Sequence, residues 1–367
     1  MVKILFIGKR FYTNRDAVQE QYGRIYQLPS FWAKAGMQTS LWLIDYHSKD
    51  VVNRTEGQLR LKSTPIFSRA SLSEWHEIRS ASKQVQFDIV VASGDCYIGL
   101  MAYRLAQRIG AKFVFDVYDK YDEFRAYLNL PGFNLFKHLL DRADGRIFAS
   151  RPLMAQLQRA THNHLTLNGI DEALFTPSDM SASRGTLGLP TTGILIGYFG
   201  SMTADRGVTD LIASAKILRD KGHPVELILA GRKEHALDTS IEGVTYLGNL
   251  PVSQVPLAMS SCDLLALPYR SSPYLDMASS CKITEYIAMR KPVVATLTPN
   301  FSGNFPLQAR QLDGLLASPG DPASIAEVIL KQLESATLLQ MPEGATWQEI
   351  SADTLEFLAT LPPPRGA

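Results

Sequence analysis

The sequence predicts an α/β protein with two parallel-sheet domains, because short apolar runs alternate with helical segments and this alternation restarts midway along the chain. At 367 residues, the chain is also too long for a single core of ordinary size. Hydrophobic residues make up 46% and charged residues 20%, as in typical folded proteins. The first apolar run, 4–7, is too short for a signal peptide or a membrane span, so we expect a buried strand and a cytoplasmic protein.

Six apolar runs in the first half are bounded by Gly, Asp or Ser and predict buried strands. They cover residues 3–7, 40–44, 88–92, 112–117, 145–149 and 165–167. Segments with the apolar spacing of a helix, such as 98–109, lie between most of these runs. Near-continuous apolar strands of this kind are typical of a parallel sheet that helices cover on both faces.

A second series of apolar runs predicts the strands of a second sheet. They cover residues 194–199, 225–230, 244–246, 264–267, 293–295 and 314–317. Helical patterns follow at 208–218 and after Asp321-Pro322, where Asp is a favoured N-cap and Pro a favoured first-turn residue. Residues 175–190 are rich in Ser, Thr, Pro and Gly and predict a linker.

These patterns predict a first domain over 1–177, a second over 178–345 and a terminal helix over 346–367. The terminal segment carries one broad apolar stripe, formed by Trp347, Ile350, Leu355, Leu358 and Leu361. An apolar stripe needs a partner surface, so we expect this helix to pack on the first domain.

Charge is distributed unevenly along the chain, although the net charge is only +1. Residues 1–177 hold 23 Lys and Arg against 17 Asp and Glu, or +6, which leaves −5 for the remainder. Two explanations fit this difference equally well. The charges are scattered and solvated, or the first half has a surface that faces an anionic membrane or a phosphorylated acceptor. No nucleic-acid partner is expected.

Cysteine and histidine spacing predicts neither disulfides nor a metal site. The three cysteines are far apart and lack a Cys-x-x-Cys pair, as free thiols in a reducing cytosol would be. The close pair His162 and His164 lacks the further ligands that a metal requires.

The stretch from Gly200 to Gly207 predicts an anion site. A strand that ends in glycine lets the backbone approach a ligand, and the N-terminus of the following helix offers free N–H groups. Ser201 and Arg206 lie in this loop, and an arginine fork suits phosphate oxygens. The alternative is an ordinary strand–turn–helix with a surface arginine.

The stretch 279–295 predicts an N-capped helix that runs into a buried strand. Lys282 and Glu285 are three residues apart and share a helix face, just after Ser280 and Cys281. We expect Lys282 and the helix-end amides to bind a diphosphate and Glu285 to bind ribose hydroxyls. The alternative is a surface ion pair of little energetic value.

Together these segments resemble the retaining GT-B glycosyltransferases of the family 4 type, the "glycosyl transferases group 1". Six motifs occur in the family's order: Asn168-Gly-Ile-Asp171 with Phe175-Thr-Pro177, the loop 200–207, Leu229-Ala-Gly231, Tyr246-Leu-Gly248, the segment 262–268, and Lys282-x-x-Glu285-Tyr-x-Ala288 with 291–295. The resemblance implies two Rossmann-like domains facing a central cleft and a sugar-nucleotide-dependent enzyme that needs no metal.

The resemblance also implies roles for individual residues. Arg206 would stabilise the leaving diphosphate, and Glu285 would hold the ribose. Tyr22-Gly23-Arg24 is similar to the family's glycine loop near donor phosphate and acceptor, although a helix-start glycine explains Gly23 equally well. Asp119 lies where relatives often carry a polar catalytic residue, with a solvated acidic loop as the alternative.

The sequence departs from the family pattern at four positions. Ser201 replaces a frequent Arg, and Arg206 replaces the usual Lys. Met277 replaces the first Glu of the Glu-x7-Glu motif, and its thioether cannot accept sugar hydrogen bonds as a carboxylate does; Asp276 is one residue away. Arg290 stands where a helix-ending Gly is usual.

The predicted function is therefore hexose transfer, with retention, from a UDP- or GDP-sugar to a glycan or lipid-linked acceptor. Synthesis of a cell-envelope polysaccharide or lipopolysaccharide is the expected setting, with peripheral contact to the inner face of an anionic membrane. Two alternatives remain, a sugar-nucleotide epimerase or phosphorylase of the same fold and a non-catalytic sugar-nucleotide-binding or scaffold protein. Met277 and Ser201 favour the second of these.

Overall fold

The computed structural model describes residues 2–12, 15–81, 86–124, 127–128 and 131–364. The chain forms two compact units, and each is described by itself below. The first unit comprises residues 1–169 and 346–367, and the second comprises residues 170–345.

The first unit is built on an eight-stranded sheet in the order β10-β9-β8-β7-β1-β4-β6-β5. The strands are β1 (Lys3–Lys9), β4 (Gln38–Asp45), β5 (Val52–Glu56), β6 (Leu59–Pro65), β7 (Ile89–Ser93), β8 (Lys112–Val117), β9 (Gly145–Phe148) and β10 (Asn163–Leu165). All neighbouring pairs are parallel except β5 with β6 at the edge. A separate antiparallel pair, β2 (Phe11–Tyr12) and β3 (Arg15–Asp16), follows β1.

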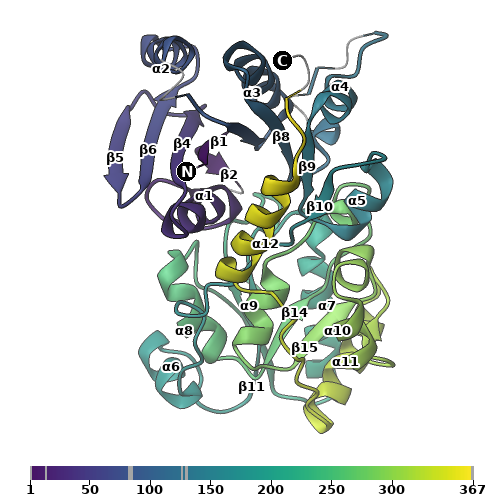
Figure 1. Cartoon of the computed structure of the whole chain (residues 1–367). Coiled ribbons are helices and arrows are strands. Elements are labelled where there is room, and N and C mark those ends of the chain that lie inside the picture. The colour runs from purple at the N-terminus through teal and green to yellow at the C-terminus, as the bar shows by residue number, and fades with distance from the viewer. Residues whose placement is uncertain (1, 13–14, 82–85, 125–126, 129–130, 365–367) are drawn as a thin grey trace. The chain divides into compact units, whose positions relative to one another are not determined.

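Helices cover both faces of this sheet (Figure 1). The helices are α1 (Arg24–Lys34), α2 (Arg69–Ser80), α3 (Cys96–Ile109), α4 (Leu135–Arg142), α5 (Arg151–Leu157) and α12 (Trp347–Thr360), with a 3₁₀ turn at Tyr121–Glu123. α1 and α12 pack together on one face, while α2, α3 and α4 lie along the other. Alternate strand residues such as Phe6 and Leu41 join Trp32 and Leu358 in the core beneath α1 and α12.

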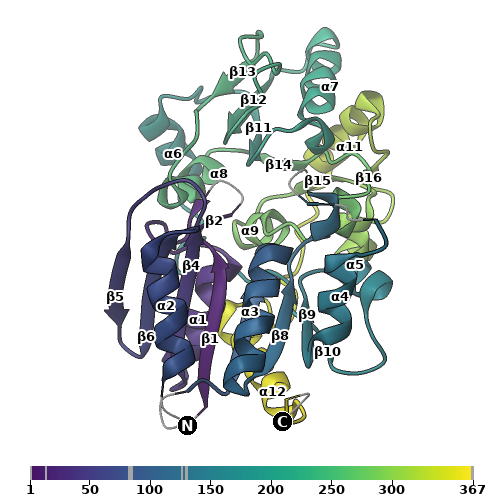
Figure 2. The same cartoon turned by 90° about the horizontal axis from the view of Figure 1, so that it is seen from above.

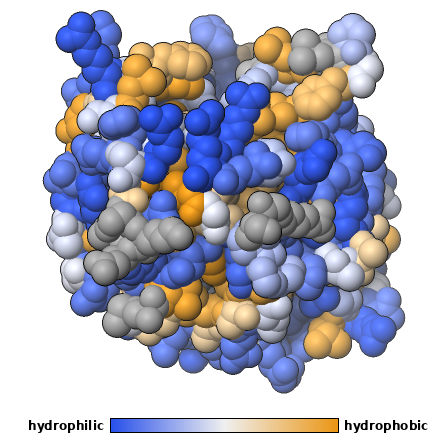
Figure 3. Space-filling model, turned by 45° about the horizontal axis from the view of Figure 1, so that its top comes forward, coloured by the Kyte–Doolittle hydropathy of each residue, from blue (hydrophilic) through white to orange (hydrophobic). Residues whose placement is uncertain are grey.

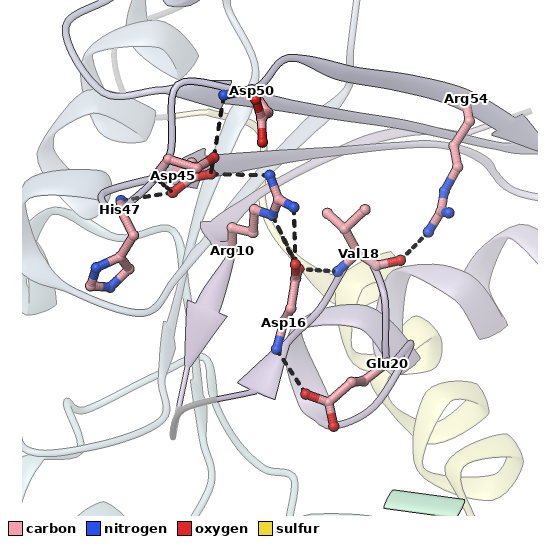
Figure 4. Close-up of polar contacts among 9 residues, drawn as sticks. Arg10, Asp16, Val18, Glu20, Asp45, His47, Asp50 and Arg54 are labelled. Carbon is pink, nitrogen blue, oxygen red and sulfur yellow. Dashed lines mark hydrogen bonds and ion pairs between the residues drawn. The ribbon is translucent and has the colours of Figure 1, made fainter. Parts of the chain in front are cut away.

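A buried ion network holds the chain at the carboxyl end of β1 (Figure 4). The Arg10 guanidinium donates to Asp16 at 2.9 Å and to Asp45, the last residue of β4, at 3.0 Å. Asp45 also accepts from the backbone N–H of His47 at 2.7 Å. The hydrogen bond to Asp16 and the two negative charges raise the pKa of Arg10 against the effect of burial. The loops after β1 and β4 are thus tied to each other.

The second unit has a six-stranded, wholly parallel sheet in the order β13-β12-β11-β14-β15-β16. The strands are β11 (Ile194–Phe199), β12 (Val225–Ala230), β13 (Val244–Tyr246), β14 (Leu264–Leu267), β15 (Val293–Thr296) and β16 (Leu316–Ala317). This is the 3-2-1-4-5-6 order of dinucleotide-binding sheets, and its direction reverses between β11 and β14. Ligands of such sheets bind beyond the carboxyl ends of the strands at this switch point.

Helices also flank the second sheet on both sides (Figure 2). They are α6 (Met180–Leu187), α7 (Val208–Asp220), α8 (Val255–Ser260), α9 (Lys282–Ala288), α10 (Pro306–Gln311) and α11 (Pro322–Glu334), with short turns η2 (Ala204–Arg206), η3 (Val252–Gln254), η4 (Leu275–Met277) and the π-helix η5 (Pro299–Gly303). α7 and α11 pack together on one side of the sheet. On the other side, α8 packs against both β11 and α6.

The structure corrects three predictions of local structure. The strand predicted at 165–167 lies at Asn163–Leu165. The N–H of Thr166 still bonds to Phe148 of β9, but its carbonyl accepts from Arg24 and so does not continue the ladder. The predicted linker 175–190 contains α6, whose N-cap Asp179 accepts from the backbone of Ala182 and whose C-cap Gly188 is left-handed. The strands β5 and β6 were not predicted, because polar residues interrupt both and leave no apolar run.

The chain leaves the first unit after Gly169, eight residues before the predicted end at 177. A Cβ on Gly169 would lie 2.6 Å from the Trp347 ring, so the departing segment packs on the start of α12 in the same unit. In the second unit, the N–H of Ile170 bonds to the carbonyl of Ala345 at 2.8 Å. The chain passes between the units twice, at 169–170 and at 345–346, and these two segments are hydrogen-bonded to each other. Linker composition does not reveal such a boundary.

Exposed side chains and helix lengths bear on membrane contact. Among the described residues, no helix is long and apolar enough to cross a bilayer. Figure 3 shows a face on which hydrophilic side chains predominate and apolar ones are scattered among them. Phe67, which is 93% exposed, lies in the first unit two residues after the end of β6.

Candidate functional site

The Gly200 loop lies at the switch point of the second sheet, directly after β11. Gly200 has φ +147°, and a Cβ built on it would lie 2.0 Å from Cε of Lys282. Gly207 has φ +66°, and its Cβ would lie 1.7 Å from the carbonyl oxygen of Pro268, the residue after β14. Both glycines are required by close approach as well as by backbone conformation. The fold thereby brings the two stretches singled out in the sequence, 200–207 and 279–295, into contact.

Arg206 ends the short η2 turn in this loop and points its guanidinium over an aromatic ring. Its Cζ lies 4.9 Å from the centroid of the Tyr269 ring, a cation–π geometry. Its Nε is buried and has no hydrogen-bond partner among the described residues. A buried, unsatisfied donor on a cation is costly, so this group is poised to receive an anionic ligand.

Lys282 and Glu285 lie in the first turn of α9. Lys282 is partly buried against Gly200, and within the described residues it forms no ion pair, either with Glu285 or with another carboxylate. The surface ion pair considered as an alternative is therefore absent there. Glu285 is only 5% exposed, which also differs from an exposed helix face.

The neighbouring candidates occupy different surroundings. The Ser201 carbonyl accepts from the Tyr198 hydroxyl at 2.6 Å, which fixes the loop backbone. The Ser280 hydroxyl is buried and bonds with the Tyr269 hydroxyl at 3.0 Å. Cys281 is partly exposed and is the N-cap of α9, but makes no side-chain cap bond, so the predicted N-capped helix start is wrong. Ser280 is turned instead toward Tyr269.

Tyr269 is the residue that the sequence patterns missed. It is 2% exposed and lies between Arg206 and the start of α9. Burial alone would raise the pKa of Tyr269, but the charges of Lys282 and Arg206, together with the hydrogen bond to Ser280, lower it. The available signal was an aromatic residue two positions after the β14 run, at the carboxyl end of a strand beside the switch point.

The segment that departs from the family pattern is held firmly in place. The side-chain amide of Asn300, in the π-helix η5, donates to the carbonyls of Leu275 and Ala278, both at 2.9 Å. Met277 lies between these two anchors and is partly buried. Asp276 Oδ2 accepts from Ser271 at 2.5 Å, while Asp276 Oδ1 is buried without a partner among the described residues. The loop thus has a defined conformation despite lacking the first Glu.

Arg290 adopts the left-handed conformation of the glycine it replaces. Its φ is +51°, directly after the C-cap Met289 of α9. Left-handed backbone costs an L-residue about 1–2 kcal/mol. The fold therefore keeps the helix ending of the family pattern at an energetic cost.

The first unit holds the two remaining candidates. Gly23 has φ +81° and is the N-cap of α1, so the helix-start interpretation describes its local role. Asp119 is 5% exposed and accepts a hydrogen bond from the Tyr12 hydroxyl, whose ring stacks on Tyr118 at 4.7 Å. A solvated acidic loop, the alternative for Asp119, does not match this burial.

The second-unit site combines two cations, close backbone approach and a buried carboxylate. Such an arrangement suits a diphosphate bound through Arg206 and Lys282, with hydroxyl groups received by Glu285. Across the described part of the chain, no three His, Cys, Asp or Glu side chains gather as metal ligands. The chemistry that these residues themselves offer is binding and stabilising negative charge.

Two Rossmann-like parallel-sheet units with this site define a GT-B fold, and solved structures agree. This chain is similar to the sucrose-phosphate synthase of Thermosynechococcus elongatus, with a TM-score of 0.67 and 17% identity. The similarity covers 98% of this chain and 95% of the synthase. The chain is also similar to Anabaena HepE, solved in complex with UDP and glucose. The TM-score is 0.69 and the identity 18%, over 98% of this chain and 100% of HepE. A third similar structure is the catalytic domain of Arabidopsis thaliana starch synthase IV, bound to ADP and acarbose. Its TM-score is 0.62 and its identity 12%, over 100% of this chain and 96% of that domain. These likenesses establish the fold.

The family comparison concerns the second unit. Residues 193–335 match the model of the family described as glycosyl transferases group 1. No curated protein matches the sequence. The family match agrees with a glycosyltransferase, the class of enzyme that the sequence predicts.

Proposed function

We propose that this chain transfers a hexose from a nucleoside-diphosphate sugar to a glycan or lipid-linked acceptor, with retention of anomeric configuration. The observation that carries this proposal is a pair of cations at the switch point. Lys282 lies against Gly200, Arg206 ends the turn in the same loop, and neither has an ion-pair partner among the described residues. Charges held partly buried without a counter-ion are stabilised when a dianionic ligand binds.

The proposed chemistry follows the charge that develops during transfer. As the bond between the sugar and the diphosphate breaks, negative charge grows on the departing oxygen. Fixed donors aimed at that charge lower the barrier, and Arg206 is the donor best placed for this task. The Gly200 backbone and Lys282 hold the diphosphate, while Glu285 holds the ribose. Asp119 is proposed as a second catalytic residue and Gly23 as a further donor-binding residue.

A ligand screen tests donor binding directly. UDP, GDP and their hexose conjugates should each be tested for an increase in unfolding temperature. A donor at a hundredfold excess over its Kd stabilises the folded chain by about 2.7 kcal/mol. Stabilisation by one nucleotide series, weakened in Glu285→Ala, is the expected result. Absence of stabilisation by every nucleoside diphosphate would contradict a donor site.

Product analysis separates the alternatives. A transferase yields a new glycoside only when an acceptor is present and otherwise hydrolyses the donor slowly. An epimerase converts donor alone, and a non-catalytic binder changes neither donor nor acceptor. Anomeric retention is read from the NMR coupling constants of the first-formed product.

Glu285 should act in donor binding and not in the chemical step. The ribose hydroxyls do not change during transfer, so Glu285→Ala is expected to raise the donor KM with little change in kcat. Glu285→Gln should raise KM less, because an amide oxygen still accepts one hydrogen bond. Steady-state kinetics with varied donor measures both. A fall in kcat at saturating donor would place Glu285 in the chemistry instead.

Membrane association is proposed from the charge of the first unit. Its residues, 1–169 and 346–367, carry 24 Lys and Arg against 18 Asp and Glu, a net charge of +6, against −5 for the second unit. Co-sedimentation with anionic liposomes should exceed that with neutral ones. Binding should fall as salt rises, because the Debye length shrinks from about 10 Å at 0.1 M to about 3 Å at 1 M.

The same assay contains the contradicting outcome. Equal and negligible binding to anionic and neutral liposomes would remove the membrane part of the proposal. The acceptor part would then rest on a phosphorylated glycan, which suits a basic unit as well.

A further inference from the structure

We propose that Tyr269 is a positioning residue that holds the Arg206 guanidinium in its reactive orientation. The inference rests on the proposed function of Arg206. Arg206 has no hydrogen bond that fixes its guanidinium among the described residues, and its Nε is buried without a partner. A long side chain of this kind samples several rotamers unless packing restrains it. The restraint that the structure shows is the Tyr269 ring, 4.9 Å from Cζ.

The backbone of Tyr269 is anchored to the loop that carries Arg206. The N–H of Arg270 donates to the carbonyl of Asp205 at 2.8 Å, and the Arg270 side chain pairs with Asp210 of α7 at 2.5 Å. On the other side, Thr296 Oγ1 donates to the Tyr269 carbonyl at 2.6 Å. The backbone of Tyr269 therefore cannot move away from the Arg206 loop without breaking several hydrogen bonds.

The hydroxyl of Tyr269 sets the tilt of the ring. It lies 3.0 Å from Oγ of the buried Ser280, just before α9. Because Lys282 begins α9 and lies over Gly200, the same tyrosine joins both cations of the site. The lowered pKa of Tyr269, due to Lys282 and Arg206 against the effect of burial, agrees with this position. Tyr269 thus links the two motifs on which the proposed donor site depends.

The test is a double-mutant cycle between Tyr269 and Arg206 in the full chain, with sugar transfer as the readout. Tyr269→Leu removes the ring face and should lower kcat by roughly 10²-fold, as a misplaced reactive group does. Donor KM should change much less. Tyr269→Phe keeps the ring and should restore most of the kcat that Tyr269→Leu loses. The double variant should be no slower than Arg206→Ala alone, because two residues that act through one effect are not additive.

A matched control separates positioning from loss of core packing. Phe305 is also aromatic and 3% exposed in the second unit, so Phe305→Leu removes a buried ring of similar size. It should lower the unfolding temperature without the selective fall in kcat. If losses from Tyr269→Leu and Arg206→Ala multiply, or Tyr269→Phe is as slow as Tyr269→Leu, the positioning role is wrong.

The outcomes also distinguish this inference from the proposed function. A strong defect in Arg206→Ala beside normal kcat in Tyr269→Leu would overturn the role of Tyr269 and leave the donor site standing. Normal transfer by Arg206→Ala would overturn the roles of both Arg206 and Tyr269, because there would then be no reactive guanidinium to position, while the proposed sugar transfer would stand. Absence of transfer by the wild-type chain would overturn the proposed function itself.

Discussion

Arg206→Ala is expected to reduce kcat by roughly 10²–10³-fold, as the loss of a fixed donor to a developing oxyanion does. The guanidinium lies over the Tyr269 ring in the loop that follows β11, and its Nε lacks a hydrogen bond among the described residues. Its interaction with the diphosphate strengthens as charge accumulates on the leaving oxygen, so the loss appears in kcat more than in donor KM. Single-turnover measurements at saturating donor and acceptor isolate the chemical step.

Two further variants sharpen the interpretation of Arg206. Arg206→Lys keeps the charge but loses the planar fork and the stacking face, so kcat should fall between wild type and Arg206→Ala. Lys216→Ala removes an exposed cation from α7, where it pairs with Asp220, and should leave kcat unchanged. Normal kcat in Arg206→Ala would reduce Arg206 to an ordinary loop residue, although the fold would stand.

Arg24→Ala is expected to lower the free energy of unfolding by about 3–5 kcal/mol, the usual cost of leaving a buried charge without its partner. The side chains of Arg24 and Asp116 are fully buried and pair at 2.6 Å. Ser93 also donates to Asp116, at 2.7 Å, and Arg24 donates to the carbonyl of Thr166. Removing Arg24 therefore leaves the buried carboxylate of Asp116 without its cation and the carbonyl of Thr166 without this donor. Urea unfolding followed by circular dichroism measures the loss.

The control for Arg24 is an exposed pair in the same unit. Lys137 and Asp141 of α4 pair at 2.8 Å with both side chains largely exposed, so Lys137→Ala should cost less than about 1 kcal/mol. Similar losses from both variants would show that burial does not govern the Arg24 pair. Because Arg24 follows Gly23, a change in donor or acceptor KM in a mild variant such as Arg24→Lys would also connect this pair to the proposed glycine loop.

Much of the second unit could be predicted from local sequence. The apolar runs 194–199, 225–230, 244–246 and 264–267 coincide with β11 to β14, because a strand buried on both faces must be apolar along its length. Asp321 caps α11 through its own side chain, as its position before Pro322 predicts. Local sequence also marked Gly200, Arg206, Lys282 and Glu285 as candidates, because glycine and charged residues near strand ends form local motifs.

Tertiary structure decided the contacts between residues distant in sequence. Arg24 meets Asp116 across 92 positions, and Lys282 lies over Gly200, yet no local pattern specifies either pairing. Gly169 adjoins Trp347 because the chain returns to the first unit, which placed the domain boundary earlier than composition did. Tyr269 became a site residue only once β14 lay beside β11. Periodicity and capping depend on neighbours within a few residues, whereas the partner of a buried charge depends on strand order, which sequence spacing does not encode.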